Sequence, residues 1–342
     1  MGATGCSNSD SSAPVTQSPV PAQGDQSRSA SSNRVRNPDH TSVLLPGEPS
    51  LWAPDISPGF ADSDAAKTAA VITTDASVGD VFVFTLTGKL TAMITGFLQP
   101  QGLAQDLAGN IYIANTLGST IPVYKNDYKT QKTTLADPGQ YPVGVAFDPI
   151  SGIIGVSNIL AANDQPGSVS FYSKGALTPC KTIGSNEFAK IYNGAFDAAG
   201  TFYIDGLDRA QTTALGMVKN GCSAKTITRL STPNTIVFPG GLRVSPTGNI
   251  AIEDQAGRAI YTYKPPVNNA FGQPVATTPL EFTSDPVDFA FTRSGSGVYI
   301  TDVGLPVSKV QKFAYAAGGV TLETIIAGKE PIGIAVTPIA GL

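Results

Sequence analysis

The sequence predicts an all-β fold assembled from a repeated unit, and three observations lead to this prediction. Charged residues make up only 14% of the 342 residues, against about 25% in an average soluble protein. Glycine is abundant, with 36 residues, as expected for a chain with many tight turns. The third observation is an internal repeat of 42 to 49 residues, a period typical of β-propeller blades.

The repeat is clearest in the segment PQGLAQDLAGNIYIAN, which begins at Pro100. Related segments follow at steps of 42, 49, 48, 47 and 45 residues, beginning at Pro142, Ile191, Pro239, Pro286 and Pro331. Six copies of one unit therefore account for most of the chain.

Each unit is predicted to form four short strands. A Pro-x-Gly turn leads into a first apolar strand, where glycine lets neighbouring strands crowd together at the axis. A polar turn such as DLAGN reverses the chain into a second strand, for example residues 111–113. A third strand with alternating apolar residues (169–172) and a fourth (225–228) complete the unit.

The ends of the repeat region predict how the ring closes. The last unit, residues 331–342, contains only a first strand, whereas residues 71–99 contain three strands and no first strand. Joined, these two pieces make one blade, which gives six four-stranded blades closed by the C-terminal strand. We expect residues 1–66 to be a disordered Ser/Pro-rich tail and residues 67–342 to be the propeller.

From about residue 71 onward the units resemble NHL repeats, whose pattern is PxGhAxDxxGNhYhAD with h an apolar residue. More distantly, Asn193 in YNGAFDAAGTFYID resembles the Asn-Gly segment of the gluconolactonase and senescence-marker family. That resemblance implies a divalent metal held at the axis by Glu, Asn and Asp. The sequence departs from the family pattern, because no Glu occupies an axial position and Gly241 lies between Asn193 and Asp288 in the repeat order.

Asn193 and Asp288 stand where the other four units have the axial glycine. Their oxygens would suit a cation such as Ca²⁺, and the alternative is hydrogen bonding to channel water or neighbouring backbone. If a metal binds, the protein would be a metal-dependent lactone or ester hydrolase with Asp205 or Glu253 as the base. Otherwise no cofactor is expected.

A carboxylate or amide also ends the second strand of most units, at Asp75, Asn115, Asn158, Asp254 and Asp302, with Asp205 one place earlier. A residue type repeated once per blade is expected to cap the turn of its own blade.

The function that needs nothing the sequence lacks is a non-catalytic scaffold that binds a protein, peptide or saccharide through its top-face loops. The two most irregular loops, residues 159–168 and 206–213, are the predicted recognition surfaces. They contribute Asn163, Asp164, Asp208 and Arg209, and aromatic residues before the first strands add Tyr141, Tyr192 and Phe238. For these aromatic residues, packing against the next blade is the alternative.

Composition excludes several classes of function. The net charge is −4 and no basic block is present, so nucleic acid is not an expected partner. The single histidine, His40, lies in the tail, which excludes a histidine triad or a histidine zinc site in the propeller. We expect a monomer.

The three cysteines bear on the compartment. Residues 3–6 (ATGC) resemble a bacterial lipobox, although the preceding signal segments are missing, so Cys6 is either a lipidation site or an ordinary tail residue. No apolar run approaches 18 residues, so any membrane link would be through this tail, and the cell envelope or the exterior is the expected location. Cys180 and Cys222 either pair or remain free, half-buried thiols, since equivalent strands of neighbouring repeats usually diverge beyond ~7 Å.

Overall fold

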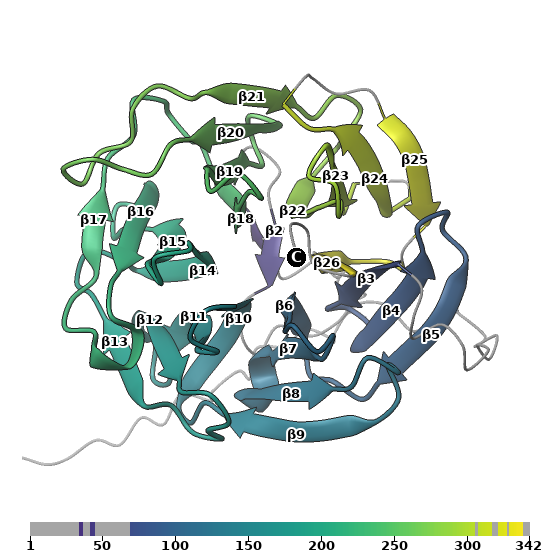
Figure 1. Cartoon of the computed structure of the whole chain (residues 1–342), viewed down its shortest axis with the longest axis horizontal. Coiled ribbons are helices and arrows are strands. Elements are labelled where there is room, and N and C mark those ends of the chain that lie inside the picture. Colours follow the sequence, from purple (N-terminus) through teal and green to yellow (C-terminus); the bar gives the residue numbers. More distant parts are fainter. Residues whose placement is uncertain are drawn as a thin grey trace, which may run out of the picture. The chain divides into compact units, whose positions relative to one another are not determined.

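A computed structural model of the chain describes residues 34–36, 42–44, 69–304, 307–316, 321–326 and 328–337. Within the described residues, six four-stranded antiparallel sheets form the blades of a β-propeller (Figure 1). Two short strands of the N-terminal region, β1 (Arg34–Arg36) and β2 (Ser42–Leu44), pair separately in an antiparallel hairpin. Cys6 and His40 lie outside the described residues.

The six blades are designated A to F in chain order. Blade A consists of β26 (Pro331–Thr337), β3 (Ala70–Asp75), β4 (Asp80–Thr85) and β5 (Leu90–Thr95). Blade B consists of β6 (Pro100–Gln105), β7 (Ile111–Asn115), β8 (Thr120–Tyr124) and β9 (Gln131–Ala136). Blade C consists of β10 (Gln140–Phe147), β11 (Ile154–Ala161), β12 (Gln165–Tyr172) and β13 (Lys181–Gly184).

Blade D consists of β14 (Lys190–Phe196), β15 (Phe202–Leu207), β16 (Thr213–Val218) and β17 (Thr228–Leu230). Blade E consists of β18 (Pro239–Val244), β19 (Ile250–Asp254), β20 (Ala259–Tyr263) and β21 (Ala276–Pro279). Blade F consists of β22 (Pro286–Phe291), β23 (Gly297–Asp302), β24 (Lys309–Ala314) and β25 (Thr321–Ile326). The loops of the described residues include the 3₁₀ turns η2 (Thr116–Gly118) and η3 (Gly221–Ser223).

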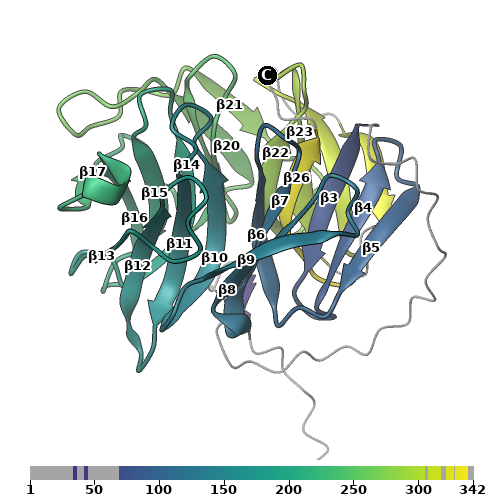
Figure 2. The same ribbon diagram turned by 60° about the horizontal axis from the view of Figure 1, so that its bottom comes forward.

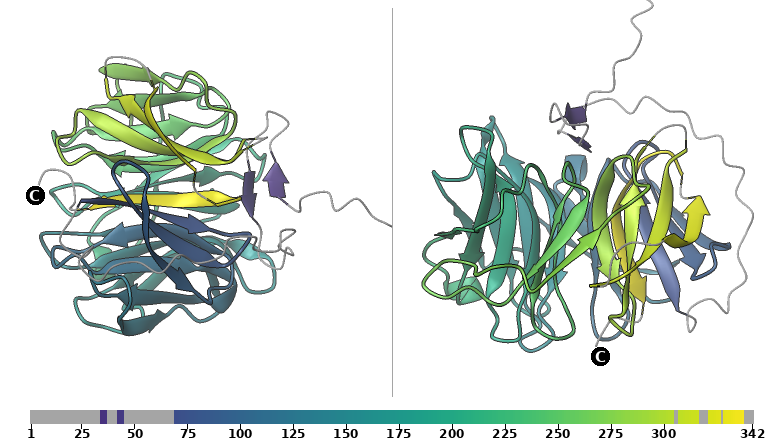
Figure 3. Two further views of the ribbon diagram at one scale, coloured as in Figure 1. Left: turned by 90° about the vertical axis from the view of Figure 1, so that its right-hand side faces the viewer. Right: turned by 90° about the horizontal axis from the view of Figure 1, so that it is seen from above.

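The last strand of the chain lies in the first blade. Figure 3 shows this strand, in yellow, beside the blue strands of the N-terminal part of the propeller. β26 pairs antiparallel with β3, and the register places Thr337 opposite Ala70 and Val336 opposite Val71. The hydroxyl oxygen of Thr337 also accepts a hydrogen bond from the Ala70 amide at 3.2 Å. Blade A is therefore built from both ends of the repeat region.

The propeller has two faces that differ in the connections they carry (Figure 2). The first strands begin at the face that we call the top and end at the bottom face. Because each blade is antiparallel, the hairpins from second to third strand and the links between blades lie at the top. The turns from first to second strand and the third-to-fourth connections lie at the bottom.

The core lies between successive blades. In strands buried on both sides, alternate apolar side chains face the preceding and the following blade, so each sheet has two apolar faces. Phe171 of blade C, for example, meets the rings of Phe196 and Phe202 of blade D at centroid distances of 6.3 and 5.6 Å.

A β-bulge near the start of each first strand explains the Pro-x-Gly pattern. All six first strands shift register at this point, which brings the axial residue against the next blade. A Cβ atom on Gly333 would lie 2.3 Å from the Gln101 carbonyl oxygen, and one on Gly102 would lie 2.5 Å from that of Val143. Glycine is needed here because the backbones of neighbouring blades almost touch.

Cys180 and Cys222 form a disulfide, with their Cα atoms 5.4 Å apart. Of the two alternatives that the sequence left open, pairing is therefore the correct one. The two cysteines do not occupy equivalent strands, because Cys222 lies in the 3₁₀ turn η3, which folds back against β12 and β13 of blade C. The bond thus fastens a loop of blade D to the outer strand of blade C.

Candidate functional site

The carboxylates that end the second strands cap backbone groups, as predicted. Asp254 accepts hydrogen bonds from the amides of Val237, Phe238 and Gly257 at 3.1, 3.2 and 3.0 Å. Two of these amides belong to the link that enters the blade, and the third belongs to the hairpin that follows. Asp75 and Asp302 make equivalent bonds, so these carboxylates serve the architecture of blades A, F and E. Asn158 does not follow the prediction, because its amide donates to the hydroxyls of Ser168 and Ser170 instead.

The residue one place earlier in the second strand has a different role near the axis. In four blades its side chain accepts a hydrogen bond from the axial amide that the bulge leaves free. The pairs are Gly333 with Thr74 (2.8 Å), Asn193 with Asp205 (2.8 Å), Gly241 with Glu253 (3.0 Å) and Asp288 with Thr301 (3.1 Å). Asp205 is thus the counterpart of Glu253, in agreement with its place one residue before the strand-ending position in the sequence.

Threonine and carboxyl side chains at this position differ in the hydrogen bonds they make beyond the axial amide. The hydroxyls of Thr74 and Thr301 also donate to the next blade, to the carbonyls of Gln101 (2.6 Å) and Ile332 (3.1 Å). Asp205 and Glu253 are completely buried, and among the described residues Oδ2 of Asp205 and Oε1 of Glu253 have no hydrogen-bond partner.

Burial changes the protonation of these two acids. It raises the pKa of Asp205 to about 8, against the opposing hydrogen bond from the Asn193 amide, and it raises the pKa of Glu253 well above its ordinary value. Asp205 is therefore largely protonated at neutral pH, and the shift at Glu253 favours the protonated form in the same direction. A carboxyl that retains its proton at neutral pH is poorly suited to act as a general base.

The two axial side chains that replace glycine are bonded to protein groups. The Asn193 side-chain amide donates to the Gly240 carbonyl at 2.7 Å. Asp288 accepts from Arg243 Nη2 at 2.6 Å and from the amides of Phe289 and Ile334 at 2.8 and 3.2 Å. These contacts match the alternative of hydrogen bonding to neighbouring backbone, and no group of three or more His, Cys, Asp or Glu arranged for a metal is found in the described part of the chain.

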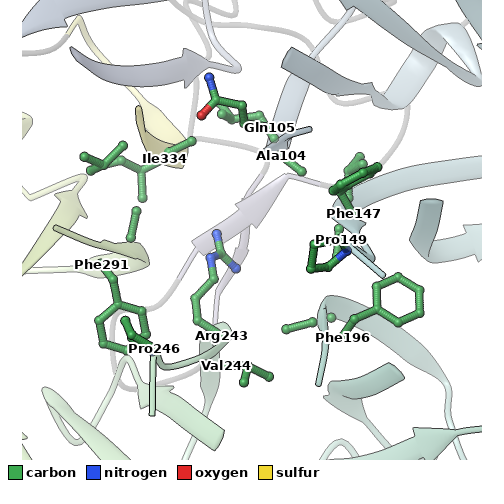
Figure 4. A pocket seen from close by; sticks show the side chains of 18 residues that line it. Ala104, Gln105, Phe147, Pro149, Phe196, Arg243, Val244, Pro246, Phe291 and Ile334 are labelled. Carbon is green, nitrogen blue, oxygen red and sulfur yellow. The ribbon is translucent and has the colours of Figure 1, made fainter. Parts of the chain in front are cut away.

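Arg243 is a residue of the axis that the sequence analysis did not single out. Five blades have alanine at its position, namely Ala104, Ala146, Ala195, Ala290 and Ala335. A single arginine in a column of alanines was the available signal. Its side chain reaches the bottom end of the channel, where the ends of the six first strands surround a pocket of about 280 Å³ (Figure 4).

The predicted loop residues lie on the top face. Asn163 and Asp164 are exposed at the tip of the β11–β12 hairpin, both with positive φ (62° and 56°). Asp208 and Arg209 lie in the β15–β16 hairpin, where Arg209 donates to the Asn186 carbonyl at 3.1 Å. The tips of both hairpins therefore lie at the surface.

Tyr192 and Phe238 do not form an exposed aromatic platform. Their side chains are 2% and 3% exposed, and their ring centroids lie 5.6 Å apart. Tyr141, which is half-buried, packs against the same cluster. The packing alternative holds for this cluster because the links into blades D and E converge on the same apolar space.

A second cavity, of about 530 Å³, is found where blades D and E meet. Most of its lining side chains are uncharged and polar, including Thr212, Thr213, Ser231, Thr232, Asn234, Thr235 and Asn269. Arg229 is the charged member; it lies 3.5 Å from Asp208 and over the ring of Phe188. We refer to this cavity as the D–E groove.

The fold and these cavities define a six-bladed β-propeller with two candidate binding sites. Comparison with family models and with curated protein sequences finds no match. Among solved structures, a chain in the crystal structure of a nidogen/laminin complex is similar, with a TM-score of 0.61 and 16% identity. The match covers 80% of this chain and 99% of that chain, and at this identity it shows the fold alone.

The structure also bears on membrane insertion. Within the residues it describes, none of the helices has the length and apolar character to cross a bilayer.

Proposed function

We propose that this protein is a non-catalytic, NHL-like scaffold that binds a partner protein or peptide at its top face, with the D–E groove as the principal contact. The observation that carries the proposal is the groove itself, about 530 Å³ in volume and lined by hydroxyl and amide groups. Such groups match the alternating donors and acceptors of an extended peptide backbone. A saccharide presents similar groups and is the second ligand class.

Apolar residues on the top face favour a peptide over a saccharide. Val237 borders the link that lines the groove and is 43% exposed, and Phe282, in the next link between blades, is 76% exposed. Leu98 occupies the corresponding link of blade B and is 56% exposed. Apolar side chains beside a polar groove suit a protein surface, where buried apolar contacts are surrounded by hydrogen bonds. The similar chain named above was solved in a protein complex, which supports the same class of partner.

The disulfide supports an extracytoplasmic location for this scaffold. Bonds such as Cys180–Cys222 persist in oxidising compartments and are rare in the cytosol. We propose that the protein acts as a monomer in the cell envelope or outside the cell, where lipidation of Cys6 would tether it through residues 1–66.

A library selection tests this function. The full chain is immobilised and challenged with a phage-displayed peptide library and, in parallel, with a glycan array. Enriched ligands are then measured against Asn234→Trp, which fills the groove, and against Lys132→Trp, which places the same side chain on the exposed outer strand of blade B. We expect binding to survive in the Lys132 variant and to be lost in the Asn234 variant. Equal binding to both variants, or no enrichment in either library, would contradict the proposal.

A further inference from the structure

We propose that the pocket at the bottom end of the axial channel binds a small apolar carboxylate, with Arg243 receiving the carboxylate group. This site lies at the axis, shares no lining residue with the D–E groove, and is independent of the proposed scaffold function. It is lined by the ends of first strands from all six blades.

The walls of the pocket are apolar almost throughout. Phe147, Phe196 and Phe291 are among its lining residues, together with Pro149, Pro246 and the alanines of the axial column (Figure 4). Its volume of about 280 Å³ lies just below the ~300–1,000 Å³ of sites for drug-sized ligands. The pocket therefore fits the body of a small aryl or alkyl compound.

Two hydrogen bonds hold the Arg243 side chain in place, and they do not use all of its N–H donors. Nη1 donates to the Leu242 carbonyl at 2.9 Å, and Nη2 donates to Asp288 at 2.6 Å. The guanidinium carbon lies 5.9 Å from the centroid of the Phe289 ring. A guanidinium has five N–H groups, so these two hydrogen bonds leave others directed to the pocket. Figure 4 shows the side chain extending into the middle of the ring of lining residues.

The local charges favour an anion over a neutral or cationic ligand. Arg243 is the only charged side chain among the described residues that line the pocket. Asp288, its one hydrogen-bonded counter-ion, is buried behind it and does not line the pocket. Asp205 and Glu253 also lie within electrostatic range, and burial raises the pKa of both, which weakens their repulsion of an anion. An incoming carboxylate therefore meets a guanidinium that is only partly neutralised, in an apolar surrounding that strengthens the contact.

Closure of the ring does not require an arginine at position 243. Five blades close with alanine at this position, so the arginine is an addition to the repeat. A residue that departs from a structural repeat and directs unused donors into an apolar pocket points to a ligand.

Calorimetric titration of the full chain with three matched probes tests the proposal. The probes are 4-phenylbutyrate, 4-phenylbutan-1-ol and 4-phenylbutylamine, which share one apolar body and differ in the end group. We expect the acid to bind at least roughly tenfold more tightly than the alcohol, as a charge-assisted hydrogen bond predicts, and the amine to bind more weakly than both. Equal affinities for acid and alcohol, or no binding of the acid, would overturn the proposal.

Three variants locate the binding. Arg243→Ala installs the residue of the other five blades and should lower acid affinity to that of the alcohol while leaving the alcohol unchanged. Ala104→Phe fills the pocket from blade B and should abolish binding of both probes.

Arg243→Ala leaves the buried Asp288 without its ion-pair partner, which could prevent folding. Asp288→Asn is a third variant that tests the proposal without this difficulty. It removes the counter-ion while preserving an acceptor for the Phe289 amide, and should tighten acid binding several-fold without changing alcohol binding. Unchanged acid affinity in Asp288→Asn would show that Arg243 does not receive the carboxylate.

Discussion

The backbone amide of Asn193 donates to Oδ1 of Asp205 at 2.8 Å, and this bond places a completely buried carboxyl at the axis of the propeller. The amide is free because the bulge in β14 removes it from the β14–β15 ladder. In blades A and F a threonine hydroxyl accepts a hydrogen bond from the equivalent axial amide and also donates one to a carbonyl of the next blade. A protonated carboxyl has the same combination of one donor and one acceptor, which an ionised carboxylate lacks.

The raised pKa of Asp205 predicts a loss of stability as the pH rises from about 4 to about 8. Its folded-state pKa is raised from 3.8 to about 8, so its contribution is complete below pH ~4 and is lost as pH rises through about 8. We expect the melting temperature of the wild type to fall between pH 5 and pH 9, and Asp205→Asn to reduce this fall. Glu253 acts in the same direction, so Asp205→Asn/Glu253→Gln should reduce it further.

The matched control for this pH profile is Asp208→Asn. Asp208 lies in a top-face hairpin, and its hydrogen bonds with Thr212 lower its pKa. Its contribution is therefore lost at acidic pH, and the fall in melting temperature between pH 5 and pH 9 should be unchanged in this variant. If the melting temperatures of Asp205→Asn and of the control fall equally between pH 5 and pH 9, Asp205 is not the group that titrates.

The close approach of blades at the axis predicts a large penalty for a single methyl group. Gly333→Ala would place a Cβ atom 2.3 Å from a carbonyl oxygen of blade B, and backbone must move to relieve the clash. We expect a cost of about 2 kcal/mol or more in the free energy of unfolding, measured with urea. Gly272→Ala is the control, because no atom lies within 4 Å of its Cβ and its φ is not positive. A change beyond ~0.5 kcal/mol in the control, or a neutral Gly333 variant, would refute this account of the repeat.

The disulfide between blades C and D predicts sensitivity to reductant. Its two cysteines are separated by 42 residues, for which chain entropy gives a stabilisation of about 4 kcal/mol. Urea unfolding of Cys180→Ser/Cys222→Ser should show a loss of this order. The wild type treated with dithiothreitol should match the double variant, and reductant should have no effect on the double variant itself.

The pairing of β26 with β3 predicts that removal of the last strand affects the whole propeller. Deletion of residues 331–342 exposes both the edge of β3 and the side of β6, and we expect the single cooperative unfolding transition to be lost. Deletion of residues 1–66 is the comparison and should leave the transition in place. A C-terminal deletion that still unfolds cooperatively at the wild-type midpoint would contradict closure by β26.

The blades could be predicted from sequence because their signals are local. Apolar alternation, turn residues and the spacing of Pro-x-Gly each act within one unit, and the repeat presents them six times. The side chains near the axis depend on neighbouring blades instead. The bulge in the first strand frees the axial amides, and the sequence alone does not show that Asp205 and Glu253 accept hydrogen bonds from them.

Other features of the candidate sites depend on how blades converge. Tyr192 and Phe238 stand before first strands in the sequence, but only the packing of blades C, D and E shows that they face each other. Arg243 was visible as an exception in a column of alanines. Asp288 replaces the axial glycine in the adjacent blade F. Only the three-dimensional structure shows that Arg243 forms an ion pair with it.

The shared blade A also has a consequence for biogenesis. Ala70 and Thr337 are 267 residues apart, and a chain grows at roughly 5–20 residues per second. The free edge of β3 thus has no partner for on the order of tens of seconds after it leaves the ribosome. A chain in this state presents an open template for wrong pairing, so chaperone binding or transport before folding would protect it.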